Sequence, residues 1–570
     1  MTSDAQPSTG PTPQLHATAD PATVQGHGGT LAVAVAQAHG VRAMFTLSGA
    51  HVFPLYDGAV TADPPLPIVD VRHEQTAVFA AEATAKLTRT PGLAVLTAGP
   101  GVTNGVSAVT TAHFNGSPLL VVGGRAPAYR WGTGSLQELD HPPLLAPVTK
   151  RAATVHETAS IADEVDSALR LATSPHRGPV FLDIAMDVVF GGATVTLPPA
   201  PTRVRVGPDA DALDRAAAAL AGARRPLLVL GSDVWSDGAQ DAATALAEDL
   251  GLPVVPNGMG RGILGPAHPL LVPRARGAAF GGADVVVVVG TPLDFRLGYG
   301  AFGGRDGAPV AAVVHCADDP AGLATHVGLA AGVAGDLTLV LDGLRERVSS
   351  GGPHPDVAAW AQGLRGRHEA AVAADAPTLA ADTEPIHPAR VYGDLVPMLA
   401  DDAVVIGDGG DFVSFAGKYV EPARPGGWLD PGPYGCLGTG LGYAVAARLA
   451  RPSAQVVLLL GDGAAGFSLM DVDTLVRHRL PVVMVVGNNG MWGLEKHPMQ
   501  MMFGYDVAAQ LAPQTRYDEV VRALGGAGEL VTRPAGLRAA LKRGFDAGVP
   551  YLVNVVTDPE VAYPRTTTGI

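Results

Sequence analysis

The chain is poor in the residues that build disulfide frameworks, thiolate metal sites and nucleic-acid surfaces. Its 570 residues include only two cysteines, Cys316 and Cys436. Two are too few for either kind of site, and they favour a reducing, cytoplasmic setting. Lysine is also scarce, with five among the 39 basic residues, and the net charge is −15. Because phosphate backbones are bound by clustered basic residues, we expect no nucleic-acid partner.

Long apolar segments are missing as well. Runs such as Val285 to Val289 are far shorter than the roughly 18 residues that a membrane span needs, so we expect no membrane partner. Residues 1–25 are rich in Pro, Thr, Ser and Ala, without a basic start or an apolar stretch. We expect a disordered leader there and not a signal peptide.

What the chain does have is apolar residues, which make up 47% of it, arranged in short runs that alternate with Ala-rich helical patterns. Continuous Val, Leu and Ile runs are typical of strands buried on both faces of a parallel sheet, so the pattern predicts α/β architecture. The predicted strands are Ala43–Leu47, Leu93–Ala98, Leu119–Gly123, Val180–Ile184, Leu227–Gly231, Val285–Gly290, Val310–His315, Val404–Gly407, Val456–Leu460, Val482–Val486 and Tyr551–Val556.

Two breaks rich in proline or glycine divide this pattern, at Leu197–Pro208 and Ser349–Pro355. They predict three domains of ordinary size. The expected order is a first domain over 26–195, a central domain over 208–348, a linker over 349–388, a third domain over 389–560 and a tail over 561–570.

The third domain contains two polar motifs at the ends of predicted strands. Gly461-Asp462-Gly463 follows one strand, and Asn488-Asn489 follows the next, with a helix expected over Ser468–His478 between them. The carboxyl ends of parallel strands are where open α/β sheets bind ligands. Carboxylate and amide oxygens suit Mg²⁺, and glycines allow close approach of a diphosphate. Taken alone, the first motif is equally typical of an ordinary turn.

With this spacing of 24 residues between the motifs, the chain resembles the thiamine diphosphate enzymes of the acetolactate synthase and 2-hydroxyacyl-CoA lyase superfamily. The resemblance implies three doubly wound parallel-sheet domains: pyrimidine-binding, central and diphosphate-binding. It implies Mg²⁺ bound by Asp462, Asn489 and the carbonyl of Met491. The cofactor contacts that it implies are Asp411, Phe412, Gly435, Leu437, Gly461, Asp462, Gly463, Ala464, Ala465, Asn489, Met491, Trp492, Gly493 and Leu494.

Further segments carry the same resemblance. Arg72-His73-Glu74-Gln75 matches the family segment whose glutamate, here Glu74, protonates the aminopyrimidine of the cofactor. Thr97–Asn104 resembles a glycine-rich family loop, and the segment Gly134–Glu138 implies that Gln137 reaches the site. Gly435–Gly440 resembles the segment that bends the cofactor, with Leu437 as the apolar wedge. Without the match, Glu74 is equally well read as a surface residue at the start of a helix.

Two residues bear on the reaction. Glu495 stands six residues after Asn489, where acetolactate synthases usually have an apolar residue and decarboxylases resembling pyruvate decarboxylase have a proton-transferring glutamate. The alternative is a surface charge paired with Lys496. Gly49-Ala50-His51 resembles a segment of benzaldehyde lyase, so His51 is a candidate proton shuttle; it is also open to a structural role.

The central domain implies a nucleotide or coenzyme A. Gly290–Arg296 resembles the region that meets FAD, ADP or CoA in the family, but the usual ribose-binding aspartate is missing at its register, which leaves Asp318 as a substitute. Four arginines are candidates for phosphate contacts: Arg261, Arg274, Arg276 and Arg296. We expect ADP as a candidate ligand of the central domain and consider FAD the poorer fit.

The resemblance is nearest to an actinobacterial group of 2-hydroxyacyl-CoA lyases of the 2-hydroxyisobutyryl-CoA type. We therefore expect a cytoplasmic lyase that cleaves an acyl-CoA substrate to formyl-CoA and a ketone or aldehyde, as a homodimer or homotetramer with sites at subunit interfaces. The alternative is acetolactate synthase, which joins two 2-keto acids. A third reading is a catalytically silent protein of the same fold.

Overall fold

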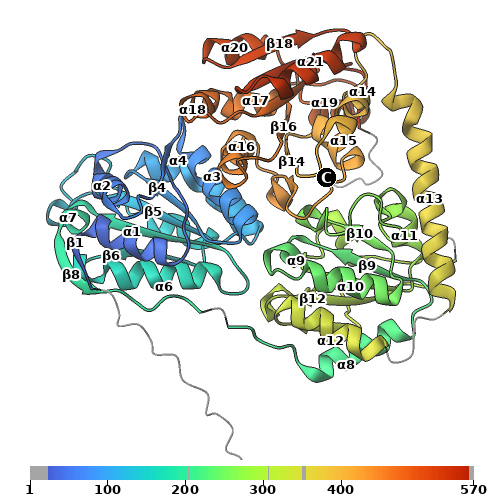
Figure 1. Ribbon diagram of the computed structural model, residues 1–570, viewed down its shortest axis with the longest axis horizontal. Coiled ribbons are helices and arrows are strands. Elements are labelled where there is room, and N and C mark those ends of the chain that lie inside the picture. Colours follow the sequence, from blue (N-terminus) through green and yellow to red (C-terminus); the bar gives the residue numbers. More distant parts are fainter. Residues whose placement is uncertain (1–22, 203, 306, 350–354, 564–570) are drawn as a thin grey trace, which may run out of the picture.

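A computed structural model describes residues 23–202, 204–305, 307–349 and 355–563. It contains three parallel α/β sheets in three domains (Figure 1). Every one of the predicted strands is present, to within a few residues at the ends. The predicted architecture is therefore confirmed.

The first domain has a six-stranded sheet in the order β3-β2-β4-β5-β7-β6, with parallel neighbours. Its strands are β2 (Met44–Thr46), β3 (Ile68–Asp70), β4 (Gly92–Leu96), β5 (Leu119–Arg125), β6 (Arg151–Val155) and β7 (Pro179–Ala185). Its helices are α1 (Gly28–Ala38), α2 (Phe53–Thr61), α3 (Glu74–Thr88), α4 (Pro100–Phe114), α5 (Pro142–Leu145), α6 (Ile161–Thr173) and α7 (Met186–Phe190).

The disordered leader predicted over 1–25 extends a few residues too far toward the first domain. Strand β1 (Thr23–His27) begins inside 1–25 and pairs antiparallel with β8 (Gly192–Thr196) at the far end of the domain. This pairing ties the entry and exit of the first domain together. Residues 1–22 of the leader lie outside the described residues.

The central domain has a five-stranded parallel sheet in the order β10-β9-β11-β12-β13. Its strands are β9 (Pro226–Leu230), β10 (Val254–Pro256), β11 (Val285–Val289), β12 (Ala312–Ala317) and β13 (Ala331–Ala334). Its helices are α8 (Ala210–Ala221), α9 (Ser232–Ser236), α10 (Gln240–Leu250), α11 (Arg276–Gly282) and α12 (Leu337–Ser349). Side chains of β11 alternate between two apolar clusters, one on each face, which explains its all-valine sequence.

The third domain has a six-stranded parallel sheet in the order β15-β14-β16-β17-β19-β18. Its strands are β14 (Val404–Asp408), β15 (Trp428–Leu429), β16 (Val456–Gly461), β17 (Val483–Asn488), β18 (Ala527–Val531) and β19 (Tyr551–Val556). Its helices are α14 (Pro388–Leu395), α15 (Asp411–Tyr419), α16 (Thr439–Ala450), α17 (Asp462–Ser468), α18 (Val472–Arg477), α19 (Gly493–Phe503), α20 (Tyr517–Ala523) and α21 (Pro534–Asp546).

Parts of the predicted linker and tail belong to the described structure. Helix α13 (Pro355–Leu379) occupies most of the predicted linker and runs beside the central and third domains (Figure 1). In the tail, Val561 and Tyr563 pack against the core of the third domain. The backbone N–H of Tyr563 donates a hydrogen bond to Asp411 at 2.8 Å, which brings the end of the chain next to α15.

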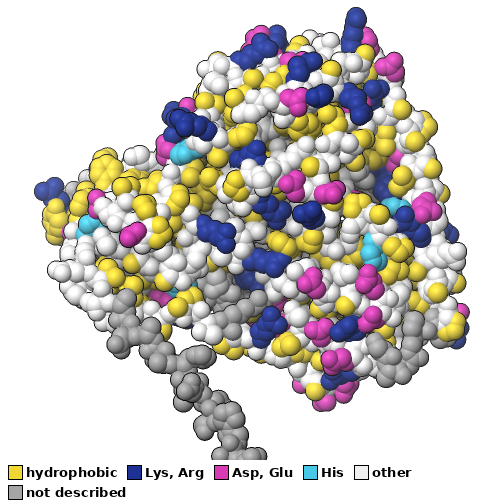
Figure 2. Space-filling model, viewed as in Figure 1, with side chains coloured by type: hydrophobic (Ala, Val, Ile, Leu, Met, Phe, Trp, Pro, Cys, Tyr) yellow, Lys and Arg dark blue, Asp and Glu magenta, His cyan; other side chains and the backbone are white. Residues whose placement is uncertain are grey.

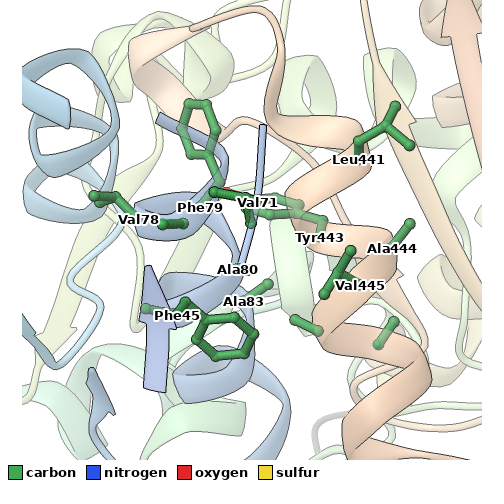
Figure 3. Close-up of a cluster of buried hydrophobic side chains, with 14 of the residues drawn as sticks. Phe45, Val71, Val78, Phe79, Ala80, Ala83, Leu441, Tyr443, Ala444 and Val445 are labelled. Carbon is green, nitrogen blue, oxygen red and sulfur yellow. The ribbon is translucent and has the colours of Figure 1, made fainter. Parts of the chain in front are cut away.

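Helices α3 and α16 join the first and third domains through apolar contacts (Figure 3). The rings of Phe79 and Tyr443 meet edge to face with centroids 6.1 Å apart. Gly442 lets the two helices approach, since a Cβ there would lie 2.7 Å from Phe79. The Tyr443 hydroxyl donates to the fully buried carboxylate of Glu82 at 2.9 Å, so even the polar end of this side chain has a partner.

On the face shown in Figure 2, Lys and Arg side chains are interspersed with Asp and Glu over the central and third domains. Mixed charge of this kind is typical of an ordinary protein surface. Across the described residues, no helix is both long and apolar enough to cross a membrane.

Candidate cofactor site

A cavity of about 260 Å³ lies at the carboxyl ends of β14, β16 and β17 in the third domain. Every residue predicted to contact the cofactor lines it except Ala465, which is fully buried in the apolar core behind it. Glu495 lines it too, as do three glycines that the sequence did not single out: Gly409, Gly410 and Gly487. The first two follow strand β14, so their position at a strand end was a usable signal.

The helix after Gly461 begins earlier than predicted. Helix α17 starts at Asp462 itself and ends at Ser468, where the expected helix begins. The expected range is itself largely helical, with a 3-10 turn over Leu469–Asp471 followed by α18. The prediction missed only the start, because strand β16 runs directly into the helix and leaves Asp462 in its first turn. The Asp462 carboxylate accepts the backbone N–H groups of Gly463 at 2.8 Å and Gly490 at 2.6 Å. Burial nevertheless raises its pKa to about 6.

The second motif lies beside the first, because β16 and β17 are neighbouring strands. Asn489 is half-buried, and its side-chain oxygen accepts the N–H of Met491 at 3.2 Å. The Trp492 ring lies against Gly463, where any side chain would collide with it. Leu494 covers Gly410 in the same way, since a Cβ on Gly410 would lie 2.5 Å from it. These contacts set the width of the cavity.

The cavity suits a diphosphate with a hard cation. Asp462 and Asn489 supply one anionic and one neutral oxygen, a donor set typical of Mg²⁺ sites that keep phosphate ligands. A Cβ on Gly461 or Gly435 would meet no atom within 4 Å and would extend into open space. Gly435 also has φ +68°, which favours glycine. Glycine at both positions keeps the backbone open to a ligand.

Asp408, at the end of β14, is a site-forming residue that sequence reasoning missed. Its carboxylate is fully buried and accepts the backbone N–H groups of Gly438 at 3.1 Å and Gly440 at 2.8 Å. These bonds fix the loop that carries Gly435 and Leu437. Burial raises the pKa of Asp408 to about 7. Its position beside the glycines after a buried strand was the available signal.

Glu495 is exposed at the rim of the cavity, in the first turn of α19. Within the described part of the chain, its carboxylate forms no ion pair. Lys496, considered as its surface partner, instead lies 4.0 Å from Glu560. The pairing alternative is therefore wrong, and Glu495 is left facing the cavity.

The remaining predicted residues lie in the first domain. Glu74 is buried at the start of α3, and its carboxylate accepts a hydrogen bond from Asn104 at 3.0 Å. His51 is buried, with Nδ1 3.1 Å from the Thr97 hydroxyl, and burial lowers its pKa. Gln137 is half-buried and packs against Gly99, at the start of the glycine-rich loop.

The two groups of predicted residues do not share a cavity within one chain. Glu74, His51 and Gln137 line no part of the third-domain cavity, whose described lining comes entirely from residues 409–495. The two domains do touch nearby, since the side chain of Gln75 donates to the Leu437 carbonyl at 3.3 Å. Asp471 adds two bonds between the domains, accepting the Arg72 N–H at 2.7 Å and the Thr76 hydroxyl at 2.6 Å.

A second cavity, of about 440 Å³, lies where the three domains meet, and Gly290, Thr291, Arg296 and Asp318 are among its lining residues. The arginines predicted to meet phosphates have other partners. Arg261 contacts Glu421, Arg274 contacts Asp375, and Arg276 donates to the carbonyl of Arg296. The Arg296 guanidinium is bound to Asp294 at 2.6 Å. Nothing in this arrangement supports ADP.

Fold and cavity together define a class, and comparison with known proteins agrees. Three sequence models of the thiamine pyrophosphate (thiamine diphosphate) enzymes match: the N-terminal TPP binding domain over 26–144, the central domain over 213–344 and the C-terminal TPP binding domain over 408–555. The chain belongs to the thiamine pyrophosphate enzymes, and with them comes thiamine diphosphate as the cofactor.

Individual relatives carry two different names. The chain is 50% identical over 547 residues to "Acetolactate synthase large subunit IlvG" of Mycobacterium tuberculosis, covering 95% of this chain and 97% of the relative. The same values hold for "Probable acetolactate synthase" of Mycobacterium bovis. It is 35% identical over 569 residues to "2-hydroxyacyl-CoA lyase 2" of Homo sapiens, covering 91% and 87% of the two chains.

Proposed function

We propose that this thiamine diphosphate enzyme is a 2-hydroxyacyl-CoA lyase, which cleaves the C1–C2 bond of its substrate to formyl-CoA and a ketone or aldehyde. The observation that carries the proposal is the unpaired carboxylate of Glu495 at the rim of the cofactor cavity. A joining reaction between two keto acids has no evident need for this group, whereas cleavage must return a proton to the one-carbon product.

The cofactor, when bound, supplies the electron sink that such carbon–carbon cleavage requires. Asp462, Asn489 and the Met491 carbonyl would hold the diphosphate through Mg²⁺, with Leu437 as an apolar wedge beside it. Glu74 would hold the proton at the pyrimidine nitrogen. Asn104 orients the Glu74 carboxylate for this task.

Two further residues would handle the substrate protons. Because burial lowers its pKa, His51 is neutral near pH 7 and fit to accept the 2-hydroxyl proton as the C1–C2 bond breaks. The carbonyl product then leaves, and Glu495 protonates the carbon that remains bound to coenzyme A as a formyl group. Gln137, packed beside the glycine-rich loop, would contact the substrate from the same side as His51.

This division of labour requires two chains. His51 and Glu74 reach the cavity only if the first domain of a second copy covers it, so we propose a homodimer, or a homotetramer built from dimers, with shared sites. The separation of the two groups of residues within one chain supports this arrangement.

The second candidate is acetolactate synthase, and by similarity alone it is the better supported of the two. The 50% identical relatives carry that name, against 35% identity for the lyases. This reaction also uses Glu74, Asp462 and Asn489, so the machinery common to both candidates does not separate them. The role of Glu495 and the use of an acyl-CoA substrate are what distinguish the two candidates.

One experiment decides between the candidates. The enzyme loaded with thiamine diphosphate and Mg²⁺ is given 2-hydroxyisobutyryl-CoA and related thioesters in one set, and pyruvate in another, with products identified by mass spectrometry. We expect formyl-CoA from the thioesters, and a loss of roughly 10²-fold or more in the Glu495→Gln variant. Acetolactate from pyruvate, without cleavage of any thioester, would establish the second candidate instead.

A matched control strengthens the assignment of Glu495. Glu560, an exposed carboxylate 4.0 Å from Lys496, should tolerate Glu560→Gln without loss of rate. A Glu495→Gln enzyme that cleaves thioesters at the wild-type rate would remove this residue from the mechanism.

A further inference from the structure

The cavity at the junction of the three domains contains a cluster that the proposed reaction does not use. His176 comes from the loop between α6 and β7 of the first domain, Asp233 from α9, and Asp318 from the end of β12. One ligand atom from each of these side chains lies within 4.8 Å of the other two. All three residues line the cavity, so this group of atoms is open to it.

Neighbouring contacts fix two members of the cluster. The Nδ1 atom of His176 lies 2.9 Å from one carboxylate oxygen of Asp318, while its Nε2 edge lies close over Gly116. Nδ1 is therefore the nitrogen that faces the cluster, and a bound ion would replace the proton that Nδ1 shares with Asp318. Arg177 donates to the other oxygen of Asp318 at 3.2 Å. An outer partner of this kind orients a ligand carboxylate toward its metal.

Asp233 is the member whose carboxylate makes no direct bond. It is 9% exposed, and no hydrogen bond or ion pair reaches its carboxylate from the described residues of the chain. Arg177 contacts Asp237 and Asp318 instead. The positive charges of His176 and Arg177 act on Asp233, but among the described residues neither side chain bonds its carboxylate directly. A buried carboxylate without a hydrogen bond gains from a cation that binds it directly. Since Asp233 lines the cavity beside His176 and Asp318, such a cation has a place to bind.

We infer that His176, Asp233 and Asp318 form a second metal site, which binds a divalent transition-metal ion such as Zn²⁺ or Mn²⁺. One imidazole and two carboxylates make a mixed donor set that suits these ions better than Mg²⁺, which prefers oxygen ligands alone. The ion would link the first domain to the central domain, and its remaining coordination positions would face the 440 Å³ cavity.

Metal binding to the full-length protein tests this inference. The enzyme is freed of metal with a chelator, reloaded with thiamine diphosphate and saturating Mg²⁺, and dialysed against Zn²⁺ or Mn²⁺ before metal analysis. We expect one additional ion per wild-type chain. Asp233→Asn and His176→Gln should each weaken binding of this ion by roughly 10–100-fold or more. Loss of a residue that only supports a metal ligand already has an effect of that size.

Two controls separate this site from others. The Asp319 carboxylate, next to Asp318 in the chain, caps a turn by accepting the N–H of Ala321. Asp319→Asn should therefore leave metal binding unchanged. Asp462→Ala removes the proposed cofactor cation and should keep the additional ion. Cofactor binding by Asp233→Asn shows that this variant is folded. Equal metal binding by wild type and Asp233→Asn, or loss of the additional ion in Asp462→Ala alone, would overturn the inference.

Discussion

The buried carboxylate of Asp408 makes the stability of the third domain depend on pH in a predictable direction. Burial raises its pKa from 3.8 to about 7, so between these values the folded protein holds a proton that the unfolded chain has released. Stability must then fall as pH rises, by about 1.4 kcal/mol per pH unit, and stop falling above pH 7. Between pH 5 and pH 7 this amounts to about 3 kcal/mol.

The substitution Asp408→Asn removes this dependence. The amide has one acceptor oxygen, so it satisfies only one of the Gly438 and Gly440 N–H groups, at a cost of roughly 1–3 kcal/mol. At pH 5 the variant should therefore be the less stable protein. At pH 8 the wild type carries a buried charge that the variant lacks. The difference in stability between the two proteins should therefore become smaller or change sign.

Thermal unfolding of wild type and variant without cofactor, at pH 5 and pH 8, measures the effect. Because other titrating groups cancel in the comparison, the difference in melting temperature should change by roughly 6–12 °C between the two pH values. Asp401→Asn, at an exposed carboxylate just before β14, is the control and should show no such change. A difference for Asp408→Asn that is independent of pH would refute the reasoning.

Three further predictions concern the site. Glu74→Gln should retain cofactor binding, measured by calorimetry, while turnover falls on the order of 10²–10⁴-fold; near-normal turnover would contradict its role. Inactive Glu74→Ala and Asp462→Ala chains, mixed under conditions of verified subunit exchange, should regain activity because one shared site can combine both intact halves; no recovery would count against shared sites. Asp471→Ala leaves the Arg72 N–H and the Thr76 hydroxyl without their acceptor, which should cost roughly 1–3 kcal/mol each in thermal unfolding experiments; an unchanged melting temperature would show that this contact carries no stability.

The two polar motifs of the cofactor cavity could be predicted because they directly follow strands. Strands β16 and β17 are continuous apolar runs, so their positions, and the positions of Asp462 and Asn489 just after them, follow from local pattern alone. In a parallel sheet the carboxyl ends of neighbouring strands share one edge. The sequence by itself therefore determined the three α/β domains and the place of Asp462 and Asn489 at one sheet edge, whereas other cavity residues, such as Gly435 and Leu437, followed from the family resemblance.

Contacts between distant segments were decided only by tertiary packing. The sequence does not show whether Glu495 pairs with its neighbour Lys496. In the folded chain Lys496 lies near Glu560, and Glu495 lines the cavity. Asp408 became a support for the loop before α16 because α16 packs over the end of β14. His176, Asp233 and Asp318 come from two domains and share no motif, so only the docking of these domains places their ligand atoms within 4.8 Å of one another. Local pattern fixes where a strand ends, whereas the partner of a side chain depends on which surfaces pack together.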